Sequence, residues 1–377
     1  MTITDVGNLF MFAGGLGMFL YGMHSMSGGI QKTAGNKMKE LLGILTSNHF
    51  MAVVVGALVT AIIQSSGATT VMVVGFVNAG IMTLTQAVGV IMGANIGTCI
   101  TAWIVSLGQL GDAFKAFSPS LYAPLLVGIG AFLIMFSKKA KKQTVGEILV
   151  GLGLLFIGLD FMGDAAGDYL HLPIFTRAFE LFGSNPILGI LIGVIVTAIM
   201  QSSSAAVGVL QTLAAAGGVV TASSAMYISL GSNIGSCCTA LLSSLGESRN
   251  AKRSAVIHLT FNVLGALVWG SGLFVLFQFR PAFGTMGIDS VGISVFHTIF
   301  NLVCTVLMTP LRGKLVALSG LLVKGGDEQE QAEQSDDAIT LRHLDDRILE
   351  TPFFAVENAI LEVVHMGHIA KDGVSRI

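Results

Sequence analysis

Charged side chains are scarce in this chain. Asp, Glu, Lys and Arg account for 11% of its 377 residues, whereas soluble domains usually carry about 25%. Hydrophobic residues account for 53%, and the mean hydropathy is +0.79. This composition and the long apolar runs exclude an ordinary soluble domain and predict a polytopic membrane protein. The formal net charge of −2 gives no indication of nucleic-acid binding.

Several catalytic and covalent motifs are also missing. The sequence holds no CxxC pair, and its four cysteines lie in apolar segments, where we interpret them as small buried hydrophobes. It holds no Walker A loop, no HExxH and no GxSxG, so we expect neither an enzyme nor an organic cofactor. ATP-driven activity is therefore not expected. The first ten residues carry Asp5 and lack a basic cluster, which argues against a cleavable signal peptide.

The apolar runs fall into two classes. Two of them, 48–80 and 186–217, are interrupted near the middle by the letters QSS. Each half has ~15 residues, which is short for a span at about 1.5 Å per residue. Paired interrupted segments of this kind point to a transporter binding site, so we predict two re-entrant helical hairpins. The other runs approach the ~20 residues of a membrane span and lie at 7–30, 84–107, 119–137, 144–163, 221–246, 254–279 and 290–311.

Basic residues set the predicted orientation. Lys and Arg cluster after the first, third, fifth and seventh spans, most densely in SKKAKKQ at 137–143. The loops between the other spans are poor in basic residues. Because basic loops remain cytoplasmic, we expect a multi-pass protein of the cell (inner) membrane with its N-terminus outside and its C-terminal tail in the cytoplasm.

The sequence also repeats itself. TAIIQSSGATTV at 60–71 matches TAIMQSSSAAVG at 197–208, and GANIGTC at 93–99 matches GSNIGSC at 231–237. The copies keep the same order at a nearly constant offset. Three spans separate the starts of the two units, so we predict inverted repeats with a substrate site near the bilayer midplane. Channels also use this arrangement, so it does not by itself separate a carrier from a pore.

We divide the chain into four segments on this basis. Residues 1–137 form the first transmembrane repeat, and 144–323 form the second repeat with the closing spans. Residues 324–343 are expected to be a flexible acidic linker. Residues 344–377 carry apolar residues at helical spacing.

The QSS motifs place amide and hydroxyl groups in apolar surroundings. A helix broken there exposes N–H groups at the start of its second half, and these attract anions. Carbonyls at the end of the first half, together with hydroxyls, attract a hard cation such as sodium. The first copy continues with Thr69 and Thr70, whereas the second has Ala206 and Val207. We therefore expect the two hairpins to bind differently.

Asn95 and Asn233 follow the two hairpins inside predicted spans, and each is flanked by glycines. An amide in hydrocarbon needs a partner. A hydrogen bond to the hairpin of the same repeat and direct ligation of an ion both remain open. Thr98 and Ser236 add oxygens nearby.

Two further motifs, HLTFN and HTIFN, place a His and an Asn on one helix face. They contain His258 with Asn262 and His297 with Asn301. We favour an interhelical hydrogen-bond clamp over a proton site for these pairs. Asp160 is a further candidate, because ionisable residues inside a membrane are often functional.

Both copies of QSS, followed in order by GAN-IG and GSN-IG, resemble the type II sodium–phosphate cotransporters and their bacterial Na/Pi relatives. The resemblance implies sodium-coupled transport of inorganic phosphate, with the QSS regions forming the site. It implies phosphate binding by Gln64, Ser65, Ser66, Gly67, Gln201, Ser202, Ser203 and Ser204. The sodium candidates are Ser66, Thr69, Thr70, Asn95, Thr98, Asn233 and Ser236. The divergence at Ala206 and Val207 leaves the number of coupled sodium ions open.

The C-terminal tail resembles the opening helix of a PhoU-like domain, which bacterial relatives often carry. We expect 344–377 to be the start of such a cytoplasmic domain, cut short. Two other functions fit the same patterns: an anion channel, and a phosphate-responsive sensor acting through the tail. The expected partners are phosphate, sodium and the lipid bilayer, and a homo-oligomer is also open.

Overall fold

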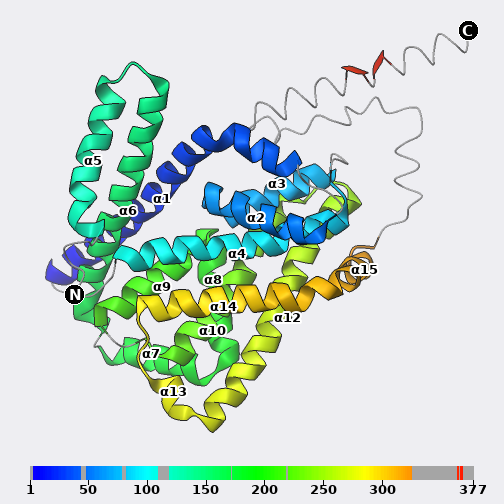
Figure 1. The fold of residues 1–377 in the computed structure, drawn as a ribbon. Helices are drawn as coiled ribbons and strands as arrows, with labels where there is room; N and C mark the ends of the chain where they lie inside the picture. The colour runs from blue at the N-terminus through cyan, green and yellow to red at the C-terminus, as the bar shows by residue number, and fades with distance from the viewer. Residues whose placement is uncertain are drawn as a thin grey trace, which may run out of the picture.

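The computed structural model describes residues 3–43, 48–78, 82–108, 119–170, 172–217 and 220–324, with four more residues at 363–364 and 366–367. This part of the chain is helical, with one isolated β-bridge between Thr221 and Gly287 (Figure 1). The all-α prediction is therefore confirmed. The predicted linker at 324–343 and the predicted domain at 344–377 lie almost wholly outside the described residues.

The helices follow one another in a fixed order (Figure 1). They are α1 (Ile3–Gly43), α2 (His49–Ile63), α3 (Ser66–Asn78), α4 (Leu84–Gly108), α5 (Pro119–Phe136), α6 (Ala140–Leu170), α7 (Pro173–Ser184), α8 (Pro186–Met200), α9 (Ser203–Gly217), α10 (Ala222–Gly235), α11 (Cys237–Ser243), α12 (Arg249–Phe279), α13 (Pro281–Thr285), α14 (Ser290–Met308) and α15 (Arg312–Leu322), with a short 3-10 turn before α15.

Membrane-spanning length separates the long helices from the short ones. By length and composition, six helical segments of the described chain can cross a bilayer, and a seventh is possible if the bent pair α7 and α8 counts as one span. The six are Val6–Thr33, Leu84–Gly108, Ala140–Gly167, Ala222–Ser243, Arg249–Phe279 and Ser290–Leu322. The predicted span at 119–137 corresponds to α5, which falls in the shorter class with the hairpin arms.

Helix α7 corrects one expectation. The sequence predicts a loop at 164–185, but α6 extends to Leu170 and α7 follows directly, with Pro173 at its first helical position. One face of α7 buries Phe179, while Ile174 on another face is exposed. The helix was missed because it is amphipathic and shorter than a span, and it meets α8 at 115°.

The first QSS run forms a helical hairpin of α2 and α3. Helix α2 packs beside α4 in the same direction, with Ala52 against Gly89 near the start of both helices. At Gly93 the backbones are so close that a Cβ would lie 2.0 Å from the carbonyl oxygen of Val53. Only glycine, which has no Cβ, permits this approach. Helix α3 then returns toward the start of α4.

The second QSS run repeats this arrangement with α8 and α9. Helix α8 packs beside α10, and a Cβ on Gly231 would lie 1.9 Å from the carbonyl oxygen of Ile190. Each hairpin therefore has one arm held tightly against the helix that follows it. Both predicted helical hairpins are therefore present, and their re-entrant course in the membrane stays a prediction.

The two hairpins enter the bundle from opposite ends. The end of α4 adjoins the start of α14, because Ser106 Oγ lies 3.1 Å from Ser290 Oγ. The start of α10 reaches the same end, where the backbone N–H of Ala222 donates to the carbonyl oxygen of Met286 over 2.9 Å. Helices α4 and α10 thus run in opposite directions, and each hairpin opens where its companion helix begins.

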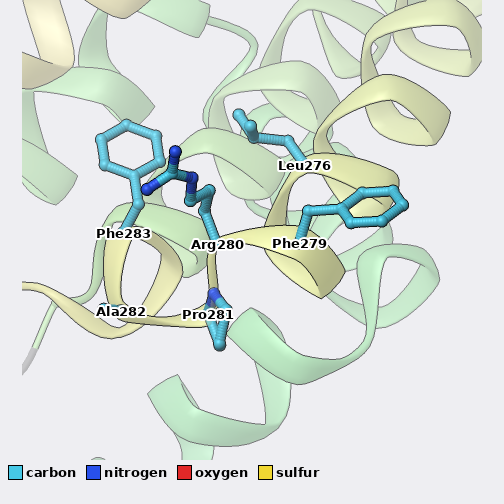
Figure 2. Close-up of a pocket in the computed structure, with 6 residues that line it drawn as sticks. All are labelled: Leu276, Phe279, Arg280, Pro281, Ala282 and Phe283. Atoms are coloured by element: carbon cyan, nitrogen blue, oxygen red, sulfur yellow. The ribbon is translucent and has the colours of Figure 1, made fainter.

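The remaining helices frame this centre. Helices α1, α5 and α6 form a group at one side, with α5 and α6 as a helical pair (Figure 1). An exposed ion pair of 2.7 Å links Lys32 to Glu147 across α1 and α6; exposed pairs of this kind contribute little stability. A surface pocket of about 410 Å³ lies where α12 turns into α13. Figure 2 draws the residues that line it: Leu276, Phe279, Arg280, Pro281, Ala282 and Phe283.

Candidate functional site

The break in each hairpin is made by glutamine. Gln64 ends α2 with φ of 58°, and Gln201 ends α8 with φ of 53°. They are the two non-glycine residues with positive φ in the described chain. A left-handed conformation costs a side-chain-bearing residue ~1–3 kcal/mol. Such backbone strain, repeated at the same motif position, marks the two tips as candidate functional elements.

Neighbouring side chains hold the first tip in place. Gln64 Oε1 accepts a hydrogen bond of 3.0 Å from Thr101 of α4. Ser27 of α1 donates to the carbonyl oxygen of Ile63, at the end of α2. The tip is therefore fixed from two sides. Ser27 was not among the predicted site residues, because its link to Ile63 spans distant segments without any shared motif.

Serine hydroxyls begin the second arm of each hairpin. Ser65 Oγ accepts from the backbone N–H of Ala68 over 3.1 Å, and Ser202 Oγ accepts from that of Ala205 over 3.2 Å. These bonds cap one N–H group at the start of α3 and one at the start of α9. Other N–H groups in the first turns have no partner within their own helix, and they give both tips a partial positive charge.

The two tips face each other across a small polar cavity. It has a volume of about 10 Å³, which is room for roughly one water molecule. A tetrahedral oxyanion is larger, so the tips would have to move apart to admit one. The cavity is lined by Ser65, Ser66, Gly67, Gln201, Ser202, Ser203, Ser204 and Ser236.

This wall overlaps closely with the residues proposed from the sequence. Seven of the eight phosphate candidates line the cavity; the eighth, Gln64, turns its amide toward α4 instead. Ser236, a sodium candidate, completes the wall from the end of α10. The cavity lining includes no charged side chain. Two helix N-termini and a set of hydroxyls are suited to an anion with a neutral protein shell.

The other hydroxyls of the first hairpin lie away from the cavity wall. Thr69 Oγ1 donates to the carbonyl oxygen of Ser65 over 3.0 Å and accepts from Thr60. Thr70 Oγ1 donates to the carbonyl oxygen of Ser66 over 2.9 Å. Both hydroxyls face backbone within the hairpin, although their lone pairs retain the capacity to bind a cation.

The two intramembrane asparagines differ in their contacts. Asn233 of α10 donates to Asn301 Oδ1 over 2.7 Å, and its Oδ1 lies 3.1 Å from His297 Nε2. Asn95 of α4 donates to the carbonyl oxygen of Ile91, one turn earlier in its own helix, over 3.2 Å. Asn233 thus bonds to α14 rather than to the hairpin of its own repeat, and ligation of an ion by either asparagine stays a prediction. Thr98 also donates within α4, to Ala94.

The two His–Asn pairs are likewise unequal. His297 and Asn301 form the interhelical clamp that we favoured from the sequence. Asn262 donates to the carbonyl oxygen of His258 over 3.0 Å and to Cys237 Sγ over 3.3 Å. Both ring nitrogens of buried His258 lack a hydrogen-bond partner within the described chain. Asp160 is exposed on α6 and is not part of the cavity wall.

The Na+/Pi-cotransporter family matches this chain over residues 18–164 and 171–311. These ranges contain both hairpins and every residue of the cavity wall. No solved structure matches the chain.

Individual relatives match over different lengths. The Salmonella typhimurium protein named "Putative inorganic phosphate export protein YjbB" is 29% identical over 354 residues, which cover 93% of this chain and 61% of that protein. The uncharacterized Bacillus subtilis protein YqeW is 29% identical over 311 residues, covering 81% of this chain and 95% of its own. Human sodium-dependent phosphate transport protein 2B is 37% identical over 109 residues, which cover 28% of this chain and 16% of that protein. This chain thus spans about three fifths of the length of YjbB.

Proposed function

The chain belongs to the Na+/Pi-cotransporter family, and on that premise we propose that it carries inorganic phosphate across the cell membrane together with sodium. The resemblance drawn from the QSS motifs agrees with this membership. The names of two relatives, a phosphate export protein and a sodium-dependent phosphate transport protein, support phosphate as the substrate.

One observation carries the proposal: two helix N-termini meet tip to tip at a cavity walled by hydroxyls. The N-termini of α3 and α9 supply positive partial charge. Ser66, Ser203 and their neighbours supply hydrogen bonds to phosphate oxygens. A phosphate ion carries more negative charge than neutral donors can offset in a dry cavity. Co-bound sodium supplies the missing positive charge, which couples the two ions.

The opposed hairpins suit a carrier that opens to one side at a time. Each tip reaches the centre from a different end, so separating one hairpin from its neighbours exposes the cavity to one side only. The tightly packed arms α2 and α8 would move with α4 and α10. Helices α3 and α9, whose first turns line the cavity, would then have to shift relative to α2 and α8 to open it.

Uptake into proteoliposomes tests this function. We expect labelled phosphate to accumulate when sodium is present outside, and uptake to stop when choline replaces sodium. Sulfate is the comparison anion. Counterflow separates the proposal from an anion channel, because a channel cannot accumulate substrate against its gradient. Phosphate flux that is equal in sodium and choline would refute sodium coupling.

The direction of net flux is a separate question. The name of YjbB specifies export, whereas a sodium symporter follows the sodium gradient. Vesicles that hold the protein in either orientation resolve this point. Phosphate import driven by an inward sodium gradient would support symport, and phosphate efflux against an inward sodium gradient would favour an exporter.

A further inference from the structure

A fully buried amide lies outside the central cavity. Gln211 of α9 has no solvent exposure. Its Nε2 has four oxygen neighbours: the Ala102 carbonyl at 3.1 Å, Ser106 Oγ at 2.9 Å, the Ser290 carbonyl at 3.0 Å and Ser294 Oγ at 2.8 Å. An amide nitrogen carries two hydrogens. The amide nitrogen therefore has four oxygen neighbours but only two hydrogens to donate to them.

The four oxygens come from two matched helix turns. Ala102 and Ser106 lie one turn apart on α4, and Ser290 and Ser294 lie one turn apart on α14, so each helix presents one carbonyl and one hydroxyl. Each hydroxyl donates to the carbonyl of the other helix: Ser106 donates to the Ser290 carbonyl, and Ser294 donates to the Ala102 carbonyl, each over 3.0 Å. All three serine side chains at this place, Ser290 included, are buried. We name these four oxygens the oxygen cage.

The other atom of the same amide has no partner. Gln211 Oε1 is buried without a hydrogen bond, and an unsatisfied buried acceptor costs ~1–3 kcal/mol. A half-turn of the amide would bring Oε1 to the position of Nε2, inside the oxygen cage. Oε1 would then join two carbonyl and two hydroxyl oxygens around one place, where all five can direct lone pairs at a cation.

We propose that the oxygen cage and Gln211 form a sodium site. Without the ion, the amide N–H groups would occupy the cage. In the ion-bound protein the amide is turned, and Oε1 joins the two carbonyls and two hydroxyls as ligands. Oxygen ligands suit a hard cation. The absence of a carboxylate from the cage favours a single positive charge, because a buried divalent ion would need compensating charge. This inference rests on the sodium coupling proposed above.

The equivalent place at the first hairpin lacks the amide. Val74 occupies the motif position of Gln211, and it packs with Ala240, Ala251 and Ala255 in a buried apolar cluster. Ala240 and Ser244 stand where Ala102 and Ser106 stand in the other repeat, so a carbonyl and a hydroxyl are present there without the amide. Within the described residues, the amide and the oxygen cage come together at the end of the bundle where the second hairpin enters. Sodium bound there would tie α9 to α4 and α14 and hold that end closed.

Binding of ²²Na+ to the full chain in lipid nanodiscs, without phosphate, tests the site. We expect Gln211→Leu to lose about one sodium ion per chain. Ser294→Ala removes one ligand and should raise the half-saturating sodium concentration roughly tenfold. Gln211→Glu keeps an oxygen and adds a charge, so it should bind sodium at least as tightly as the wild type. Val74→Ala is the matched control and should not change the number of ions bound.

Two results would overturn the site. One is a folded Gln211→Leu protein that binds as many sodium ions as the wild type with the same affinity. The other is Gln211→Glu losing sodium as completely as Gln211→Leu, since that would make the amide a hydrogen-bond clamp. If Gln211→Leu does not elute as a folded protein, the sodium affinity of Ser294→Ala decides the question. An unchanged half-saturating sodium concentration in that variant would overturn the site. Wild-type phosphate uptake without sodium dependence would instead refute the proposed function, which is a separate measurement.

Discussion

Asn233 donates its side-chain amide to Asn301 over 2.7 Å, and this bond joins α10 to α14 in a buried part of the bundle. The equivalent residue of the first repeat, Asn95, bonds within its own helix. The two copies of the same sequence motif are therefore held by different contacts.

The first prediction concerns this bond. Asn301→Ala should lower the free energy of unfolding by about 1–3 kcal/mol, because Asn233 is then buried without its acceptor. Thermal unfolding in nanodiscs in choline buffer measures the change. A double-mutant cycle with Asn233→Ala should show a coupling energy of about 0.5–3 kcal/mol. Strictly additive effects would mean that the bond does not contribute to stability.

The second prediction concerns close helix packing. Gly93→Ala places a methyl group 2.0 Å from the Val53 carbonyl oxygen, and no flexible side chain is available to yield. We expect a loss of ~3 kcal/mol or more, or failure to fold. Gly75→Ala is the matched control within α3, since a Cβ there meets nothing within 4 Å. Equal yields of folded protein for the two variants would contradict the packing described here.

The third prediction concerns the strained tips. Gln201→Gly should raise stability by ~1 kcal/mol, because glycine adopts positive φ without strain and the Gln201 side chain is exposed. Gln64→Gly relieves the same strain but loses the bond to Thr101, so the two effects should nearly cancel. The denaturation midpoints of the two variants test this difference. A Gln64→Gly variant that is more stable than Gln201→Gly would contradict the prediction.

The fourth prediction separates cavity hydroxyls from structural ones. Ser66→Ala removes a hydroxyl from the cavity wall and should raise the half-saturating phosphate concentration about tenfold, for a loss of ~1.4 kcal/mol. Thr70→Val removes a hydroxyl that donates to the Ser66 and Gly67 carbonyls, and should leave that concentration unchanged at saturating sodium. Uptake in proteoliposomes measures both. A stronger effect of Thr70→Val would place phosphate deeper along α3.

The hairpins could be predicted from sequence because their signals are local. Gln and Ser interrupt an apolar run at one point, and the half-runs are too short to span. The repeat then relates the two hairpins, because GAN-IG and GSN-IG follow them at nearly the same distance. Helix α7 escaped prediction since Pro173 and its amphipathic pattern resemble a loop when only long apolar runs are sought.

The oxygen cage could not be predicted in the same way. Gln211 is one amide in an apolar run, and its partners Ser106 and Ser290 lie in distant segments without a common motif. The serines individually look like small packing residues, which is their usual role in membrane helices. Their convergence depends on how α4, α9 and α14 pack together, and sequence spacing does not encode that.

The opposed entry of the hairpins has an electrical consequence. Helices α3 and α9 both begin at the central tips and run toward opposite ends of the bundle, so their dipoles point in opposite directions and largely cancel along the axis through the bundle. The dipoles of such a hairpin pair would contribute little to any response of the protein to membrane voltage. Any voltage dependence of transport would then arise from the charges that it binds, at about 2.3 kcal/mol per elementary charge for each 100 mV crossed.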